Sequence, residues 1–306
     1  MTGMSHAFDK IYVYDKTGKV PEGGTSLDRP MNVRSVNDAT VITSTPIASV
    51  TEFVVQCEAQ SGFSGIFFVC VPTPMKQDGS CDTSIAWSVV EEIAKVPVNG
   101  DVDRVVCVKS TVPPGSVEKW NEAIKGSRTI VTHNPEFLTE RNAIEDFKNQ
   151  NRIVIGGPID AVKRVSHLYS IAYPGVLVVE TTSTTSEMVK YFTNVQLATR
   201  VVLSCELAEV VDALVKKGFD VKYDDVKCIA SHDHRLGGSH MNVPGFDGIR
   251  GARGSCFNKD LNGLLTLSEA LNVDTKVMNA VNKKNLQIVP IENRDWLTME
   301  RAVVKS

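Results

Sequence analysis

The segment G-A-R-G-S-C-F-N-K-D, residues 251–260, places a thiol, an ammonium and a carboxylate within about one helical turn. Gly254 permits a close backbone approach to a ligand, and a helix starting just after Cys256 would favour the thiolate through its dipole. Asp260 follows Cys256 by four residues and would share its helical face. The pattern predicts a nucleophilic cysteine. The alternatives are a buried packing cysteine and, for Asp260, a solvated helix charge or a salt bridge to Lys259.

A second pair with chemical potential is Lys190 and Asn194, which are also four residues apart. On one helical face, an ammonium and an amide can point at the same oxyanion and stabilise charge that develops during a reaction. The alternative is that both side chains lie on the solvated side of a long helix.

Strands and helices that alternate along the first part of the chain must position these residues. Near-continuous β-branched runs predict strands that are buried on both faces of a parallel sheet. The expected strands are 11–15, 39–44, 66–71, 104–110, 129–132, 152–157 and 176–180, and the expected helices between them are 47–59, 84–95, 116–124 and 159–170. This alternation predicts a Rossmann-like, doubly wound α/β domain.

The pattern changes after Thr182. Apolar residues recur at helical spacing from about Ser186 to about Lys217, and Gly218 fits the C-terminal cap of one long helix. Shorter helices are expected at 223–231, 259–271 and 275–285. We therefore predict a nucleotide-binding domain at 1–183 and an all-α domain at 184–306. The long apolar stripe predicts a homodimer.

The composition excludes several classes of function. The 306 residues are 42% hydrophobic and 23% charged with a net charge of −3, which favours neither nucleic acid nor an anionic membrane. No apolar run reaches the roughly 18 residues of a membrane helix. The 7 cysteines form no C-x-x-C pair, which argues for reduced thiols in a cytoplasmic compartment, or in a host cytoplasm if the chain is viral. No metal site is predicted.

A dinucleotide-binding domain normally opens with a strand and G-x-G-x-x-G, and this sequence contains no such motif. I-Y-V-Y-D, residues 11–15, is typical of the second strand of that unit. Asp15 stands where a ribose hydroxyl is usually bound. The chain is thus expected to begin partway through the first helix.

Several motifs in order along the chain resemble the UDP-glucose/GDP-mannose dehydrogenase family, in a short form without its third domain. They are V-P-T-P-M-K-Q-D-G-S-C-D-T-S (71–84), K-S-T-V-P-P-G-S (109–116), N-P-E-F-L-T-E-R-N-A-I-E-D-F (134–147), E-M-V-K-Y-F-T-N (187–194) and the segment from Asp233 to Leu261. The resemblance implies NAD-dependent oxidation of a nucleotide-sugar C6 alcohol to a carboxylate. Which nucleotide sugar is oxidised stays open.

The resemblance also implies roles for individual residues. Cys256 matches the nucleophile, Asp260 the residue that orients or deprotonates water, and Lys190 with Asn194 the oxyanion pair. The remaining positions match a water site at Thr111 and Glu136, a cofactor cleft at Val71, Pro72, Thr73, Ser110 and Thr111, and substrate contacts at Glu136, Phe137, Leu138, Lys190, Asn194, Arg235 and Gly254. Alternatives are a helix cap for Thr111, an ordinary proline-rich turn for residues 71–73 and a surface charge for Arg235.

The sequence departs from the family pattern near the cysteine. Arg253 replaces a glycine, Asn258 a proline and Cys205 an asparagine. Arg253 could block a substrate or bind its phosphates. Two functions follow: an NAD-dependent nucleotide-sugar dehydrogenase, or a degenerate relative that serves as a binding or structural component of an assembly.

Overall fold

The computed structural model describes residues 10–12, 41–43, 49–59, 63–98, 103–139, 142–299 and 301–304. The chain divides into two compact units, here called unit 1 (Met1–Val71 with Ser84–Met188) and unit 2 (Pro72–Thr83 with Val189–Ser306). The predicted ribose ligand, Asp15, lies outside the described residues.

Unit 1 contains a sheet of five strands in the order β3-β4-β5-β6-β7. The strands are β3 (Ile66–Val69), β4 (Arg104–Val108), β5 (Thr129–His133), β6 (Arg152–Gly156) and β7 (Leu177–Thr181). All neighbours pair in parallel except β5 and β6, which meet antiparallel at His133 and Gly156. The predicted α/β fold with a mostly parallel sheet is confirmed. The antiparallel pair was not predicted, because strand direction is set by the path of the connecting chain. Strands β1 (Lys10–Tyr12) and β2 (Val41–Thr43) pair in parallel with each other.

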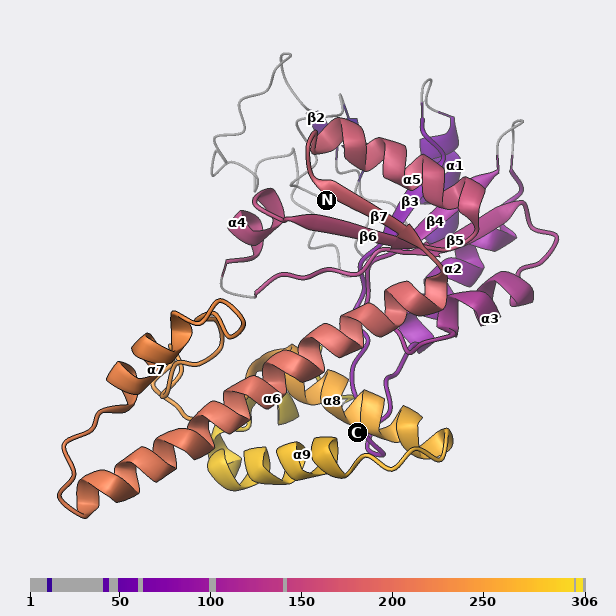
Figure 1. The fold of residues 1–306 in the computed structure, drawn as a ribbon. Coiled ribbons are helices and arrows are strands. Elements are labelled where there is room, and N and C mark those ends of the chain that lie inside the picture. The colour runs from indigo at the N-terminus through magenta and orange to yellow at the C-terminus, as the bar shows by residue number, and fades with distance from the viewer. Residues whose placement is uncertain are drawn as a thin grey trace. The chain divides into compact units, whose positions relative to one another are not determined.

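Helices cover both faces of this sheet (Figure 1). They are α1 (Val50–Glu58), α2 (Ser84–Lys95), α3 (Ser116–Ala123), α4 (Ala143–Lys148) and α5 (Ile159–Ala172). Alternate residues of β4 enter different cores: Val106 and Val108 pack with α1, α2 and α3, whereas Val105 and Cys107 pack with α5. A strand that is buried on both faces is mostly apolar, which explains the V-V-C-V run at residues 105–108. The buried Arg104 at its start is paired with Glu58 at 2.7 Å.

A buried carboxylate fixes the start of the long helix α6 (Ser183–Lys216) within unit 1. Glu187 is fully buried, and its carboxylate accepts the backbone N–H groups of Gly115 (2.6 Å) and Val117 (2.8 Å) at the start of α3. It thus acts as the cap of α3, whose own N-cap residue, Gly115, has no side chain to offer. The alternative that Thr111 caps this helix is wrong.

Unit 2 is helical. Besides the rest of α6 it contains α7 (Tyr223–Ser231), α8 (Gly254–Ala270), α9 (Lys276–Ile288) and the short 3-10 helices η3 (Ile291–Asn293) and η4 (Asp295–Leu297). Tyr191 and Val195 of α6 pack with Leu261 and Leu264 of α8. A Cβ at Gly263 would lie 3.2 Å from the Tyr191 ring, so the missing side chain allows α6 and α8 to come this close. None of the helices in the described part of the chain is long and apolar enough to cross a bilayer.

The helix that carries Cys256 begins earlier than expected. The sequence predicts a helix over 259–271, but α8 already starts at Gly254, so Cys256 lies in its first turn rather than before it. The reason is a contact that is distant in sequence: the Asp295 carboxylate accepts the N–H of Gly254 at 3.1 Å. Because the capping group comes from η4, local sequence patterns do not reveal it.

Candidate active site

Asp260 is the centre of a buried polar cluster in unit 2. Its carboxylate forms an ion pair with Lys259 (2.5 Å) and accepts a short hydrogen bond from the Asn194 amide. The side chains of Asp260 and Lys259 are only 1% and 7% exposed. Asn194 thus links α6 directly to Asp260 on α8. The salt bridge to Lys259 is confirmed, and a solvated helix charge at Asp260 is wrong.

The charge state of Lys259 is decided by its neighbours. Burial alone would lower the pKa of its ammonium, but the charge of Asp260, followed by Cys81 and Cys256, outweighs burial and raises the pKa of Lys259 above its ordinary value. Lys259 is thus a buried cation shared by a carboxylate and two cysteines. Sequence reasoning considered it only as a salt-bridge partner. The signal that it is a site residue was its position between Cys256 and Asp260.

Cys256 is half-buried in the first turn of α8. Its Sγ lies 3.5 Å from the hydroxyl oxygen of Ser255. The N-terminal turn of a helix presents unpaired N–H groups and a positive dipole end, both of which favour a thiolate. A partly accessible thiol in this position, next to a buried ammonium, is suited to nucleophilic attack.

Lys190 and Asn194 are both buried on the α6 face that packs in unit 2. The alternative that they lie on the solvated side of the helix is therefore wrong. Asn194 reaches Asp260 directly. The role of Lys190 and Asn194 as an oxyanion pair stays a prediction.

The segment 72–83 belongs to unit 2 and contributes a second cysteine. Cys81 is buried, and its thiol donates to the carbonyl oxygen of Thr73 at 3.7 Å. Burial raises the pKa of the Cys81 thiol, with Lys259 acting in the opposite direction. Thr73 is buried and Pro72 is exposed. No motif pointed to Cys81 as a neighbour of the site.

In unit 1, Ser110 joins the carboxyl ends of β3 and β4. Its hydroxyl accepts the N–H of Val71 (3.0 Å) and donates to the carbonyl oxygen of Val71 (2.7 Å). Val71 and Ser110, both predicted at the cofactor cleft, are thus brought together by direct contact. Ser110 holds the backbone at this edge, where ligands bind in doubly wound folds.

A buried polar network that the sequence analysis did not find lies just below this edge. Lys109 donates to the Asn134 side-chain oxygen at 3.1 Å, and Tyr169 donates to the same oxygen. The Asn134 amide donates to the Val154 carbonyl oxygen at 2.8 Å. This network fixes the start of the N-P-E-F-L segment. A lysine directly after a buried strand was the available signal.

The residues that follow Asn134 are placed at the end of β5. Glu136, Phe137 and Leu138 are half-buried, as is Thr111 after β4. The guanidinium of Arg152 lies 4.5 Å from the Phe137 ring centroid, which fixes that ring. A water site at Thr111 and Glu136 stays a prediction.

Arg235, the predicted contact to substrate phosphates, is 78% exposed and paired with its neighbour Asp233. Its Nε donates to the Asp233 carboxylate at 2.9 Å, and a second guanidinium nitrogen donates at 2.5 Å. The structure therefore agrees with a surface charge and leaves the substrate contact as a prediction.

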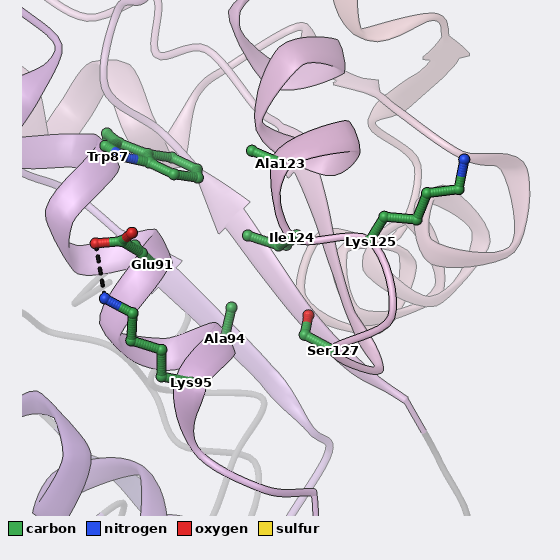
Figure 2. A pocket seen from close by; sticks show the side chains of 8 residues that line it. All are labelled: Trp87, Glu91, Ala94, Lys95, Ala123, Ile124, Lys125 and Ser127. Atoms are coloured by element: carbon green, nitrogen blue, oxygen red, sulfur yellow. Dashed lines mark ion pairs between the residues drawn. The ribbon is translucent and has the colours of Figure 1, made fainter.

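A hollow in unit 1 contains none of the predicted site residues (Figure 2). Its lining comes from α2 and from the turn after α3: Trp87, Glu91, Ala94, Lys95, Ala123, Ile124, Lys125 and Ser127. These segments lead into β4 and β5, so the hollow lies at the amino edge of the sheet, opposite the ligand edge. Glu91 and Lys95 neutralise each other at 3.0 Å. This hollow offers no reactive group.

Comparisons with known proteins agree with the arrangement. Residues 40–172 match the model of the "UDP-glucose/GDP-mannose dehydrogenase family, NAD binding domain", and residues 184–287 match that of the family's central domain. A UDP-glucose 6-dehydrogenase of Rickettsia typhi is 35% identical over 225 residues, covering 71% of this chain and 48% of its own length. One of Pseudomonas aeruginosa is 32% identical, with coverages of 72% and 48%. The chain thus spans about half the length of the curated relatives it matches.

Solved structures show the same fold. A UDP-glucose dehydrogenase from Pyrobaculum islandicum superposes with a TM-score of 0.70 at 25% identity, covering 93% of this chain and 64% of that one. A UDP-D-ManNAc dehydrogenase from Pyrococcus horikoshii gives a TM-score of 0.67 at 20% identity, with coverages of 94% and 65%. The fold is thus that of a nucleotide-binding dehydrogenase. The two domain models name it more closely: the chain belongs to the UDP-glucose/GDP-mannose dehydrogenase family.

Residues 40–172 are accordingly the family's NAD-binding domain. The residues of this domain provide part of what an NAD site needs. The ligand edge of β3 and β4 is present, and Ser110 fixes the Val71 backbone there. The glycine loop that binds a pyrophosphate through its amides does not occur in the sequence. The residues that would hold NAD at this edge are Val71, Ser110 and Thr111.

Proposed function

We propose that the chain oxidises the C6 alcohol of a nucleotide sugar to the carboxylate through a covalent intermediate on Cys256. The observation that carries the proposal is the buried Asn194–Asp260–Lys259 cluster on the two helices that carry the catalytic candidates. A structural role alone would not explain why charged groups are buried beside a half-exposed cysteine, since buried ion pairs cost desolvation energy.

The reaction divides into steps that these residues can perform. NAD, when bound, supplies the hydride acceptor for both oxidations. The Cys256 thiolate adds to the carbonyl carbon of the aldehyde intermediate and forms a C–S bond, and the former carbonyl oxygen carries the negative charge. Lys190 stabilises that oxyanion. After the second oxidation the group is a thioester. Water attacks it, the C–S bond breaks, and the thiolate and the carboxylate are released.

Asp260 has the capacity to orient the attacking water. A carboxylate offers about four lone-pair directions, and Lys259 and Asn194 use one on each oxygen. The remaining directions can accept a proton from water. The raised pKa of Lys259 keeps an ammonium beside the Asp260 carboxylate.

Turnover assays with Cys256→Ser test this function. UDP-glucose, GDP-mannose and UDP-N-acetylmannosamine are offered with NAD, and NADH is followed by absorbance. The unmodified chain should release two NADH per sugar, and Cys256→Ser should stop turnover or trap the aldehyde. Cys228→Ser, at an exposed cysteine on α7, is the matched control and should change nothing. Turnover by Cys256→Ser would contradict the proposed nucleophile.

A chain that turns over none of these sugars would favour the second candidate function, a degenerate relative that acts as a binding component. Arg253, which replaces a glycine of the family pattern near Cys256, favours that candidate. Calorimetry of NAD binding separates the dehydrogenase from the degenerate binding component. A dehydrogenase must bind NAD, whereas a degenerate binding component need not retain the cofactor.

We also propose a homodimer built on α6. Exposed apolar side chains recur along this helix at Leu203, Leu207, Val210 and Leu214, which is the spacing of one continuous stripe. An obligate interface of this kind should bury on the order of 2,000 Å² or more. Light scattering at micromolar concentration should show a dimer, and Leu207→Glu should give a monomer. A monomeric unmodified chain would contradict the proposal.

A cytoplasmic location is proposed as well. All seven cysteines are unpaired in the structure, as expected for a reducing compartment.

A further inference from the structure

Two of the three residues that depart from the family pattern, Cys205 and Asn258, contact the short segment before Cys256. Cys205 of α6 accepts the N–H of Gly251 on its sulfur at 3.2 Å. Asn258 donates to the carbonyl oxygen of Ala252 at 2.9 Å, and it accepts a hydrogen bond from Asn285. Asn285 in turn accepts the N–H of Ala252 at 2.8 Å. Side chains thus fix a backbone that glycines and a proline would otherwise shape.

Arg253, the third departure, is held by the C-terminal segment and the preceding loop. Its guanidinium donates to the Asn293 carbonyl oxygen (2.8 Å), to the carboxylate of Asp247 (2.6 Å) and to that of Asp295 (3.2 Å). The structure therefore shows Arg253 engaged with carboxylates, whereas the sequence left open whether it blocks a substrate or binds its phosphates.

Asp295 connects Arg253 to the nucleophile helix. One oxygen of its carboxylate binds Arg253, and the other accepts the N–H of Gly254, the first residue of α8. A carboxylate at this position stabilises the helix but opposes a thiolate in the same turn, because like charges repel. Arg253 offsets that charge. Arg253 and the capped Gly254 thus lie three and two residues before Cys256, and both bind the same carboxylate.

We propose that Arg253 and Asp295 are positioning residues that set the ionisation of Cys256, a role that rests on the proposed nucleophilic function. Asp295 caps the helix and fixes the start of its first turn, and Arg253 prevents the carboxylates from suppressing the thiolate. The charged groups around this turn come from several elements. They are Lys259 and Asp260 on α8, Arg253 and Asp247 before it, and Asp295 of η4.

The pH dependence of Cys256 alkylation tests this assignment. The full chain is treated with iodoacetamide at a series of pH values, and the peptide that contains Cys256 is quantified by mass spectrometry. Arg253→Ala should raise the pH at which Cys256 alkylation is half-maximal, here called the midpoint, by about one unit. Asp295→Asn should lower this midpoint by about one unit. A shift of this size is what one unit charge near a helix end produces. Arg253→Lys keeps the charge and should restore the midpoint of the unmodified chain.

Arg250→Ala is the matched control. Arg250 pairs with Asp212 of α6 at 2.7 Å, so the variant removes the same charge from the same loop without touching Asp295. It should leave the midpoint unchanged. If Arg253→Ala and Asp295→Asn shift the midpoint in the same direction, or not at all, the pair acts only on the fold and the proposal is overturned. Asp295→Asn can still accept the Gly254 N–H, so it keeps the test decisive if Arg253→Ala does not fold.

Alkylation reports ionisation and not turnover, so the two proposals fail separately. A Cys256→Ser variant that retains dehydrogenase activity refutes the nucleophile. Opposite shifts in the alkylation midpoint would still support the charge coupling between Arg253, Asp295 and Cys256.

Discussion

The carboxylate of Glu187, at the start of α6, should make the stability of the chain depend on pH in a direction unusual for a carboxylate. Burial raises the pKa of Glu187 from 4.5 to about 7, and Glu118 adds to this, although the N–H groups of Val117 and Gly115 lower it. The folded state thus keeps a proton between pH 4.5 and 7 that the unfolded state has already lost. Stability from Glu187 is present below pH 4.5 and is lost as the pH rises through 7.

The magnitude follows from the shift in pKa. The difference between 7 and 4.5 is 2.5 pH units, and at about 1.4 kcal/mol per unit the folded state loses about 3 kcal/mol across this window. Glu187→Gln has no proton to lose. The variant also changes a hydrogen bond to α3, but that effect is the same at every pH.

Urea unfolding of both proteins between pH 4 and pH 8 measures this effect. The difference in unfolding free energy should shift by about 3 kcal/mol in favour of Glu187→Gln as the pH rises. Because all other titrating groups are the same in both proteins, their contributions cancel in the difference between the two unfolding free energies. A difference that is constant with pH, or one that moves in favour of glutamate, would show that the N–H groups at α3 outweigh burial and would refute the reasoning.

Two further substitutions address the site itself. Gly251→Ala should lower the unfolding free energy by about 2 kcal/mol or more, because φ at Gly251 is +102° and the new Cβ would lie 2.3 Å from the Val289 side chain. Gly238→Ala is the control, because its Cβ would lie 3.7 Å from its nearest neighbour. In the same denaturation assay, its unfolding free energy should stay within about 1 kcal/mol of that of the unmodified chain. Asp260→Ala should cost about 3–5 kcal/mol, because it leaves the buried ammonium of Lys259 unpaired. Thermal unfolding that matches the unmodified chain would mean that Lys259 finds water or another partner.

Local signals predicted the helices well. The helices Ser84–Lys95 and Tyr223–Ser231 have the expected bounds, because apolar spacing and end residues are properties of the segments themselves. The family motifs likewise pointed to Asn194, Asp260 and Cys256, and the contact between Asn194 and Asp260 is present.

Long-range contacts account for what the sequence did not reveal. The start of α8 depends on Asp295, and the cap of α3 depends on Glu187. The direction of β6 beside β5 and the burial of Lys259 are also decided by tertiary packing. A local pattern contains no information on partners that lie far away in the chain.

The assignment of residues 72–83 to unit 2 has a consequence for the order in which the chain can fold during synthesis. The backbone of Met75 exchanges hydrogen bonds with Ala302 and Val304, near the C-terminus. At about 5–20 residues per second, a ribosome needs roughly 10 to 45 s to reach those partners after Met75 has been made. During that interval these hydrogen-bonding partners of the segment have not yet been made. This segment carries Cys81, which is buried in the folded chain.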